Sequence, residues 1–277
     1  MISLTPPRFQ DGVAYPLNDI TQILQSAFDA LPPHHQAEVM SLHAHMTPTD
    51  KPGDELMSIL RSNAYVTGDS LGLFPKGARI NHSCRPNTSQ YWNAQTGRRI
   101  VYVNRHIEQG EEMFATYIPL LYPQEARQSR LDQYGFKCTC SACALEETPR
   151  NASDNRRQDL AKAFASFDSQ KTISVPQSVV GKRKARNNAE ASVQLVTQIE
   201  EEGLADYYIR AYHIAAVAHA KAEEWESATL WANKGFEMSL LADPHARSTG
   251  TRELQTLTGY LIEKWNEALR DHYIRNN

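Results

Sequence analysis

The residues with the most distinctive chemistry in this sequence are its four cysteines. Cys138, Cys140 and Cys143 lie together in FKCTCSAC, and Cys84 stands alone far upstream. A structural Zn²⁺ site takes four ligands in a tetrahedron, with each sulfur about 2.3 Å from the ion. One short loop can supply three corners, and Cys84 is the only thiol left for the fourth. We therefore expect one closed structural Zn²⁺ site built from all four, with free buried thiols as the alternative.

Composition and charge restrict the class of protein around these cysteines. The chain has 277 residues, of which 41% are hydrophobic and 22% charged, so it can bury a core and is not disordered throughout. The length suggests one or two domains. A net charge of −3 gives no overall attraction to nucleic acid or anionic lipid. No run is long and apolar enough to span a membrane, and MISLTPPRFQ is not a secretory signal.

The expected compartment follows from the same features. We predict an intracellular protein of the nucleus or cytoplasm, without direct nucleic-acid or membrane partners. In a reducing compartment, cysteines serve more often as metal thiolates than as disulfides. The basic residues at 182–186 are interpreted as a solvated segment, with a nuclear-import signal as the alternative.

The first part of the chain is expected to combine helices with short strands. Apolar residues recur at helical spacing within 17–31, and a second helix is expected over 34–45 with Val39 and Leu42 facing inward. A loop follows at 47–53. From residue 71 to 117 the pattern changes to short β segments, with a hairpin formed by 88–93 and 98–103 and a strand after Gly110. The four histidines between 34 and 45 are interpreted as solvated.

The second part is expected to be helical after a polar connection. Residues 146–190 are interpreted as a polar linker, and 191–277 as a helical C-terminal domain. Alanines at helical spacing precede Trp225 and Trp231, which we interpret as the core of a helix pair rather than as ligand contacts. The stretch HAKAEEWESATLWANKGFEMSLLADP is similar to one tetratricopeptide-type helix pair, but one such unit does not establish a repeat array.

Three motifs occur in order before and around the cysteine cluster. They are NHSCRPN from Asn81 to Asn87, GEEMFATY from Gly110 to Tyr117, and the C-x-C-x-x-C segment. Together they resemble the SET-domain protein-lysine methyltransferases, and more narrowly the SET-and-MYND subfamily and its fungal single-SET relatives. The resemblance is best over residues 55–145. It implies an α+β fold: a SET-type β-rich domain with a pseudoknot and a post-SET zinc site, followed by an α-helical, tetratricopeptide-like C-terminal region.

The resemblance also implies a division of the chain and a role for individual residues. Residues 1–54 would be a helical inserted SET region rather than the initial strands, and 55–145 the SET core with its post-SET zinc knuckle. Tyr117 would be the catalytic tyrosine that orients the substrate amine beside the reacting methyl group. The residues expected to bind S-adenosylmethionine or to line the lysine channel are Asn63, Ile80, Asn81, His82, Tyr134 and Phe136. Glu111 and Glu112 are interpreted as structural, capping or pairing with Arg98, Arg99 or Arg105.

The sequence departs from the family at its N-terminal end. Active SET domains begin with a G-x-G segment whose backbone approaches the methionine end of the cofactor. No two of the 13 glycines here are separated by one residue, and no cysteine precedes Cys84 to form a MYND finger. The chain is therefore interpreted as a truncated or an impaired methyltransferase, or as a fragment. A non-catalytic, zinc-stapled interaction module and a SET fold recruited to small-molecule biosynthetic chemistry are the alternatives.

The expected partner is a protein or peptide substrate that carries a lysine. A homo-oligomer is a further expectation, because a strand from a second chain would complete the N-terminal sheet. The substrate, the target lysine and the degree of methylation cannot be read from the sequence.

Overall fold

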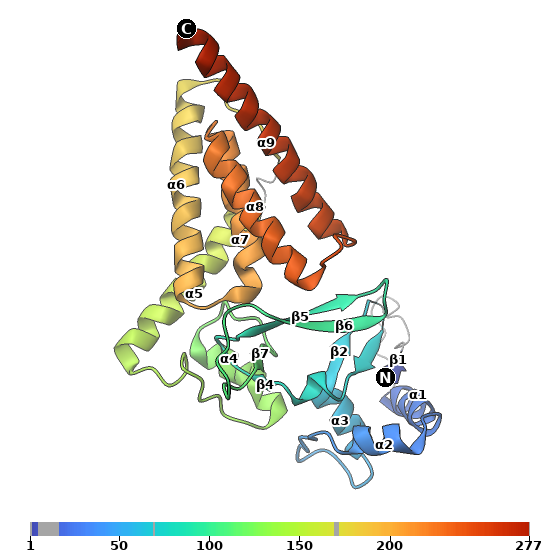
Figure 1. The fold of residues 1–277 in the computed structure, drawn as a ribbon. Helices are drawn as coiled ribbons and strands as arrows, with labels where there is room; N and C mark the ends of the chain where they lie inside the picture. The colour runs from blue at the N-terminus through green and yellow to red at the C-terminus, as the bar shows by residue number, and fades with distance from the viewer. Residues whose placement is uncertain (1, 5–16, 69, 169–171, 277) are drawn as a thin grey trace.

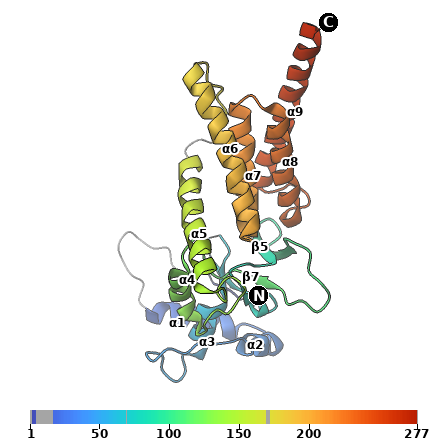
Figure 2. The same cartoon turned by 90° about the vertical axis from the view of Figure 1, so that its left-hand side faces the viewer.

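The protein consists of two halves that differ in their secondary structure. The computed structural model describes residues 2–4, 17–68, 70–168 and 172–276. In the N-terminal half, up to residue 145, short strands are surrounded by short helices, whereas the C-terminal half from residue 147 is entirely helical apart from its connections (Figure 1). Figure 2 shows the helices of the C-terminal half lying side by side above the strands of the N-terminal half.

Three short helices and a three-stranded sheet begin the described chain. The helices are α1 (Leu17–Asp29), α2 (Pro33–Met40) and α3 (Glu55–Asn63). Leu24, Val39 and Leu42 are buried between them, as the apolar spacing predicted, although α2 ends five residues earlier than expected. The sheet has the order β1-β3-β2, with strands β1 (Ile2–Leu4), β2 (Ala64–Val66) and β3 (Leu71–Leu73).

The prediction that residues 1–54 contain no initial strand is wrong. The backbone of β1 pairs antiparallel with β3, from Ile2 opposite Leu73 to Leu4 opposite Leu71. A strand of three residues is too short for an alternating pattern to distinguish it from a loop, and only the long-range pairing reveals it. Because β1 occupies one edge of β3 and β2 the other, the chain itself supplies both neighbours of that central strand.

A hairpin and a parallel strand pair complete the N-terminal half. The predicted hairpin is confirmed as β5 (Thr88–Asn93) and β6 (Arg98–Val103). β4 (Asn81–His82) pairs in parallel with β7 (Phe114–Ala115), which is shorter than the strand expected after Gly110. This pairing brings the NHSC segment beside the residues that precede Tyr117. The helix α4 (Gln124–Leu131) then leads to the cysteine cluster, and the 3₁₀ turns are η1 (Gly77–Arg79) and η2 (Asp132–Tyr134).

The C-terminal half is a set of antiparallel helices. They are α5 (Glu147–Asp168), α6 (Val179–Glu201), the 3₁₀ turn η3 (Ala205–Tyr207), α7 (Tyr208–Lys221), α8 (Trp225–Ala242) and α9 (Thr249–Asn276). Trp225 and Trp231 pack against the buried core of α7 and α8, as predicted. Whether these pairs are tetratricopeptide repeats stays a prediction.

The prediction of a polar linker over 146–190 is wrong as regards secondary structure. α5 covers about half of it, and α6 begins at Val179 rather than near residue 191, so the two helices together cover most of the segment. The buried face of α5 includes Ser153 and Arg157, and that of α6 includes Ala185 and Ala189. A face built partly from polar and small residues produces no apolar periodicity in the sequence, which is why the pattern over 146–190 indicates a polar linker.

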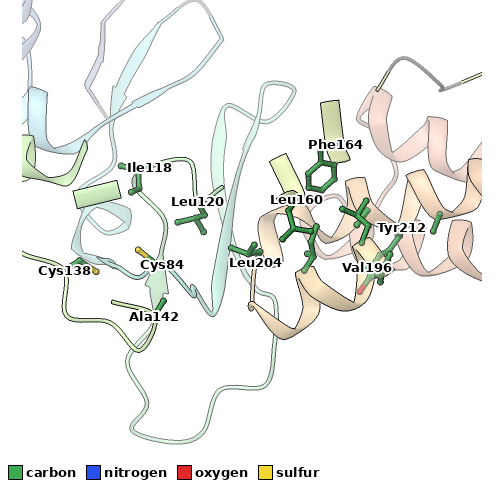
Figure 3. Close-up of a cluster of buried hydrophobic side chains, with 14 of the residues drawn as sticks. Cys84, Ile118, Leu120, Cys138, Ala142, Leu160, Phe164, Val196, Leu204 and Tyr212 are labelled. Carbon is green, nitrogen blue, oxygen red and sulfur yellow. The ribbon is translucent and has the colours of Figure 1, made fainter. Parts of the chain in front are cut away.

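One hydrophobic cluster joins the two halves. It extends from Cys84 and Cys138 through Leu120 and Leu204 to α5, α6 and α7 (Figure 3). Leu120 and Leu204 are fully buried, and they come from the segment after Tyr117 and from the turn between α6 and α7. The cysteine region therefore shares its core with the helices.

Candidate functional site

The four cysteines meet as the sequence predicted. Their sulfur atoms all lie within 4.8 Å of one another, and the Cys84 and Cys143 sulfurs are 3.7 Å apart. Four sulfurs about 2.3 Å from one ion in a tetrahedron would be about 3.8 Å from each other, so the group has the size of a Zn²⁺ site. The backbone N–H of Cys84 donates to the Cys140 sulfur, which supports a thiolate there. The residues present therefore fit a bound metal ion.

Two buried arginines compensate the charge that four thiolates would carry. Arg127 lies near Cys84 and Cys143, whose charges act on it, and Arg157 donates to the carbonyl oxygen of Cys84 at 3.2 Å. Both side chains are at most 1% exposed. Burial by itself disfavours the charged form of Arg127, but the nearby cysteines raise its pKa above the ordinary value. A buried cation beside a sulfur cluster is favourable when the cluster is negative.

His82 connects the cysteines to Tyr117. Its Nδ1 accepts the backbone N–H of Tyr117 at 3.1 Å, and its Nε2 lies 3.4 Å from the Cys84 sulfur. Because Nδ1 accepts a hydrogen bond, Nε2 carries the proton and donates to that sulfur. Burial lowers the pKa of His82 to about 4, so the ring is neutral at neutral pH. His82 therefore contacts the Cys84 thiol of the candidate metal site on one side and the backbone of Tyr117 on the other.

A cavity of about 660 Å³ lies beside these residues, and we call it the main cavity. Its volume is in the range of small-molecule sites in proteins. Phe114 and residues 137–141 of the cysteine segment line it. Most of the predicted site residues line it as well: Asn63, Asn81, His82, Tyr117, Tyr134 and Phe136. The structure therefore brings together residues from α3, β4, β7 and the turn before Cys138.

Tyr117 lies in an aromatic wall of the main cavity. Its ring centroid is 5.3 Å from that of His82 and 5.1 Å from that of Tyr134, and Phe136 meets it edge-on at 6.4 Å. Its hydroxyl donates to the carbonyl oxygen of Ile80 at 2.7 Å. Burial, reinforced by neighbouring tyrosines, raises the pKa of Tyr117 to about 12. The hydroxyl is therefore neutral, and it presents oxygen lone pairs to the cavity.

The remaining predicted residues differ in how they face the cavity. Asn63 donates both hydrogens of Nδ2, to the carbonyl oxygens of His43 and Ile59, so Oδ1 is the atom it can offer a ligand. Asn81 is exposed, and its amide binds the Glu112 carboxylate at 2.6 Å. Ile80 does not line the cavity, and it contributes the carbonyl oxygen that holds Tyr117.

The acidic pair after Gly110 is structural, as the sequence indicated. Glu111 forms an ion pair with Arg105, and Glu112 holds Asn81. The hydrogen bond from the Arg105 guanidinium, followed by that from the backbone N–H of Glu108, lowers the pKa of Glu111 to about 2. Glu111 therefore stays ionised and is unsuited to proton transfer at neutral pH.

Gly135 allows Tyr134 and Phe136 to turn toward the cavity. Its φ of +76° lies in the left-handed region, which side chains rarely adopt, and a Cβ atom there would lie 2.1 Å from the ring of His45. The residues around this glycine thus contact the inserted helical segment as well as the cysteine cluster.

Tyr65 belongs to the same aromatic group and was not identified from the sequence. Its hydroxyl donates to the carbonyl of Gly77 at 3.2 Å, and its charge state is felt by both Tyr117 and Tyr134. The Arg99 guanidinium lies 4.0 Å above its ring. The sequence carries no local signal for Tyr65, because these neighbours come from other elements of the fold.

Comparison with known proteins supports the interpretation of this region. Residues 18–118 match the SET domain family. The match covers about a third of this chain. Within it lie the NHSC segment and Tyr117, whereas the C-x-C-x-x-C segment lies just beyond the matched range.

Three relatives carry similar SET segments. The chain is 43% identical over 103 residues to the histone-lysine N-methyltransferase set5 of Schizosaccharomyces pombe. It is 38% identical over 98 residues to the human N-lysine methyltransferase SMYD2, and 36% identical over 86 residues to the mouse histone-lysine N-methyltransferase SMYD3. The matches cover 36%, 35% and 31% of this chain. They span 32%, 22% and 20% of the relatives, so the similarity covers a third of their length or less.

None of the helices in the described residues is both long enough and apolar enough to cross a membrane.

Proposed function

We propose that this chain is a protein-lysine N-methyltransferase that uses S-adenosylmethionine, with one structural Zn²⁺ held by Cys84, Cys138, Cys140 and Cys143. The observation that carries the proposal is the position of Tyr117, whose hydroxyl oxygen faces the main cavity while its proton is committed to Ile80. The names of the relatives, which are lysine methyltransferases, support the same reaction.

The reaction requires alignment more than covalent help. When bound, S-adenosylmethionine would supply an electrophilic methyl group on a sulfonium. The lysine nitrogen would use its lone pair to take this methyl group, with the thioether as the leaving group, and the methylated ammonium product would later lose a proton to water. Only the neutral amine has that lone pair, and an amine in water has a pKa of about 10.4. Aromatic walls around Tyr117 disfavour the charged amine and so favour the reactive form.

Tyr117 would orient the amine. Because its hydroxyl proton binds Ile80, its oxygen accepts an N–H of the substrate and directs the nitrogen lone pair along the cavity. With a pKa near 12, Tyr117 is neutral at pH 7 and is not a base. Asn63 and His82 would contact the cofactor, and Tyr134 and Phe136 would line the channel for the lysine; all four line the main cavity.

Cofactor binding is the first test. We expect zinc-loaded protein to bind S-adenosylhomocysteine in isothermal titration calorimetry, and to transfer a labelled methyl group from S-adenosylmethionine to a lysine peptide library. The missing G-x-G segment favours the non-catalytic interaction module as a second candidate. Absence of heat from a zinc-loaded, folded sample would remove the methyltransferase and leave that module.

Tyr117→Phe tests the residue role. It removes only the hydroxyl, so we expect at least a hundredfold loss of kcat with retained S-adenosylhomocysteine binding. Tyr122→Phe is the matched control, because Tyr122 is a partly exposed tyrosine outside the main cavity. Equal activity of the two variants would refute the orienting role.

A further inference from the structure

A second cavity of about 270 Å³ lies between the hairpin and the helices, and we call it the hairpin cavity. One wall comes from β5, β6 and the residues Ala115 and Thr116. The other comes from Ala205 and Asp206 of η3, Ile209 of α7 and Met238 of α8. It exists only because the two halves of the chain meet there.

The hairpin cavity and the main cavity are neighbours. Phe114 and Tyr117 line the main cavity, whereas Ala115 and Thr116 line the hairpin cavity. The short strand β7 and the two residues after it therefore separate the two cavities. Tyr65 also lies near both cavities, because the Arg99 guanidinium of the hairpin cavity is 4.0 Å from its ring centroid and its charge influences Tyr117. A chain lying over the hairpin cavity would therefore be close to the tyrosine that meets the substrate amine.

Asp206 is the acidic group of the hairpin cavity. Its side chain retains access to solvent, yet protein atoms surround most of it, as expected in a recess. Burial raises its pKa above the ordinary value, and the hydroxyl of Ser89, 2.5 Å away, opposes that shift. The same Ser89 oxygen accepts from Asn104 at 3.0 Å, so the carboxylate is held in place. In the described part of the chain, no basic side chain forms an ion pair with Asp206.

Arg99, the basic side chain that lines the hairpin cavity, already has partners within the protein. Arg99 donates to the side-chain oxygen of Gln90 at 2.6 Å and lies flat over the ring of Tyr65. Tyr102 lies close enough to Asp206 for that carboxylate to raise the pKa of its hydroxyl, after burial as the main cause. The cavity thus offers an uncompensated carboxylate next to an aromatic side chain, which is a combination that favours a cation.

We propose that the hairpin cavity binds a positively charged side chain of the substrate, lysine or arginine, next to the lysine that is methylated. The proposal rests on the proposed function for its location beside Tyr117, and it adds a class of substrate: peptides with a second basic residue near the target. The ammonium or guanidinium would pair with the Asp206 carboxylate, and Tyr102 would contact its alkyl stem or its charge.

A positional peptide library provides the test. Each peptide has one lysine at a fixed position as the methylation target, and every flanking position is occupied in turn by arginine, lysine, alanine or glutamate. A flanking lysine could itself be methylated, so the arginine peptides are the ones in which the fixed lysine is the single target. We expect one flanking position at which arginine raises kcat/KM about tenfold over alanine, the ratio typical of a charge-assisted hydrogen bond. A preference for glutamate at that position would assign the cavity to Arg99 and overturn the proposal.

Asp206→Asn tests the residue itself. Asparagine keeps the shape and an acceptor for Ser89 but removes the charge, so we expect the arginine-to-alanine ratio to fall to about one. Glu201→Gln is the matched control, because it removes one negative charge at an exposed position at the end of α6. A ratio unchanged in Asp206→Asn, with an unchanged melting temperature, would refute the subsite.

The test remains decisive if no methyl transfer is found. The same labelled peptides are then measured by fluorescence anisotropy in the presence of S-adenosylhomocysteine. Binding that favours arginine in the original protein and loses this preference in Asp206→Asn supports the subsite without the enzyme activity. Binding that is indifferent to arginine, or no binding at all, overturns the subsite independently of the methyltransferase proposal.

Discussion

The strands of the N-terminal half are two to six residues long, whereas the helices of the C-terminal half have 14 to 28 residues. Short strands in two- and three-stranded sheets bury little apolar surface, and such sheets are marginal on their own. The N-terminal half is joined instead by side-chain links: the four cysteines, the His82 bridge and buried asparagines. The helices are packed closely through buried alanines, such as Ala216, Ala228 and Ala232.

The candidate site depends on contacts from the helices of the C-terminal half. Arg157 of α5 holds the carbonyl oxygens of Cys84 and Leu120, and the hydroxyl of Tyr207 accepts the backbone N–H of Leu120 at 3.2 Å. Glu202, at the end of α6, binds Ser153 and Arg156 and pairs with Arg85, the residue after Cys84. The helices therefore position the loop that carries the NHSC motif.

Loss of the four-cysteine metal site should reduce stability by the largest amount, and the reduction should be confined to the N-terminal half. In Cys84→Ser, or after chelation, we expect the N-terminal half to unfold, because a structural Zn²⁺ site contributes about 10 kcal/mol and exceeds the net stability of many domains. Near-ultraviolet circular dichroism and hydrogen exchange by mass spectrometry measure this, with protection retained in α7 and α8. Ser141→Ala, an exposed change between two of the cysteines, is the control.

Equal loss of hydrogen-exchange protection in both halves would contradict the prediction that only the N-terminal half unfolds. It would mean that the helices depend on the cysteine region for their stability, rather than the reverse.

Glu202→Gln should have the next largest effect. It leaves Arg157 buried without its carboxylate partner, and breaking such a pair costs about 3 kcal/mol. Urea unfolding measures the free energy, with the exposed neighbour Glu201→Gln as the control. Similar free energies for the two variants would indicate that the halves are not coupled through Glu202.

Glu202 also makes a pH prediction. Burial favours its neutral form, but the hydrogen bonds from Ser153 and Arg156 and the arginine charges outweigh burial and lower its pKa below 4.5. A lowered folded pKa gives stability that is present above pH 4.5 and is lost as the pH falls through the folded value. The acid side of the stability–pH curve should therefore be flatter in Glu202→Gln than in the original chain.

A larger residue at Ala216 should destabilise the C-terminal half by a smaller amount. Ala216 is fully buried among alanines of α7 and α8, and overpacking of this kind costs about 1–3 kcal/mol. Ala216→Leu should lower the melting temperature of the helices and leave zinc content unchanged, while Ala165→Leu on the exposed face of α5 should change neither. A loss of zinc in Ala216→Leu would indicate that the two halves are not stabilised independently of each other.

The smallest effect concerns the tyrosines at high pH. Because the folded pKa of Tyr117 is about 12 against an ordinary 10, its contribution is complete below pH 10 and is lost as the pH rises toward 12. The expected loss is up to about 2 kcal/mol, and it should be reduced in Tyr117→Phe. Urea unfolding between pH 9 and 11.5 measures it, and a curve identical in both proteins would contradict the burial of this hydroxyl.

Much of the candidate site could be predicted from local motifs. Cys138, Cys140 and Cys143 are close in sequence, so their meeting needs only a short loop. Cys84 is then predicted as the fourth ligand, because it is the only other cysteine in the sequence. Asn81, His82 and Tyr117 lie in motifs whose order resembles a known family. Tyr65 and Asp206 have no such local signal, because their importance comes from neighbours on other elements.

The sequence by itself determined the cysteine group, the hairpin and the two N-terminal helices, because each is specified by spacing within a short segment. Only the tertiary structure decided that β1 pairs with β3, that residues 147–168 form a helix with a buried arginine, and that Asp206 lies in a recess beside the hairpin. The physical reason is that a buried polar group is stable only with its partners. Those partners, such as Glu202 for Arg157, come from distant parts of the chain that no local pattern connects.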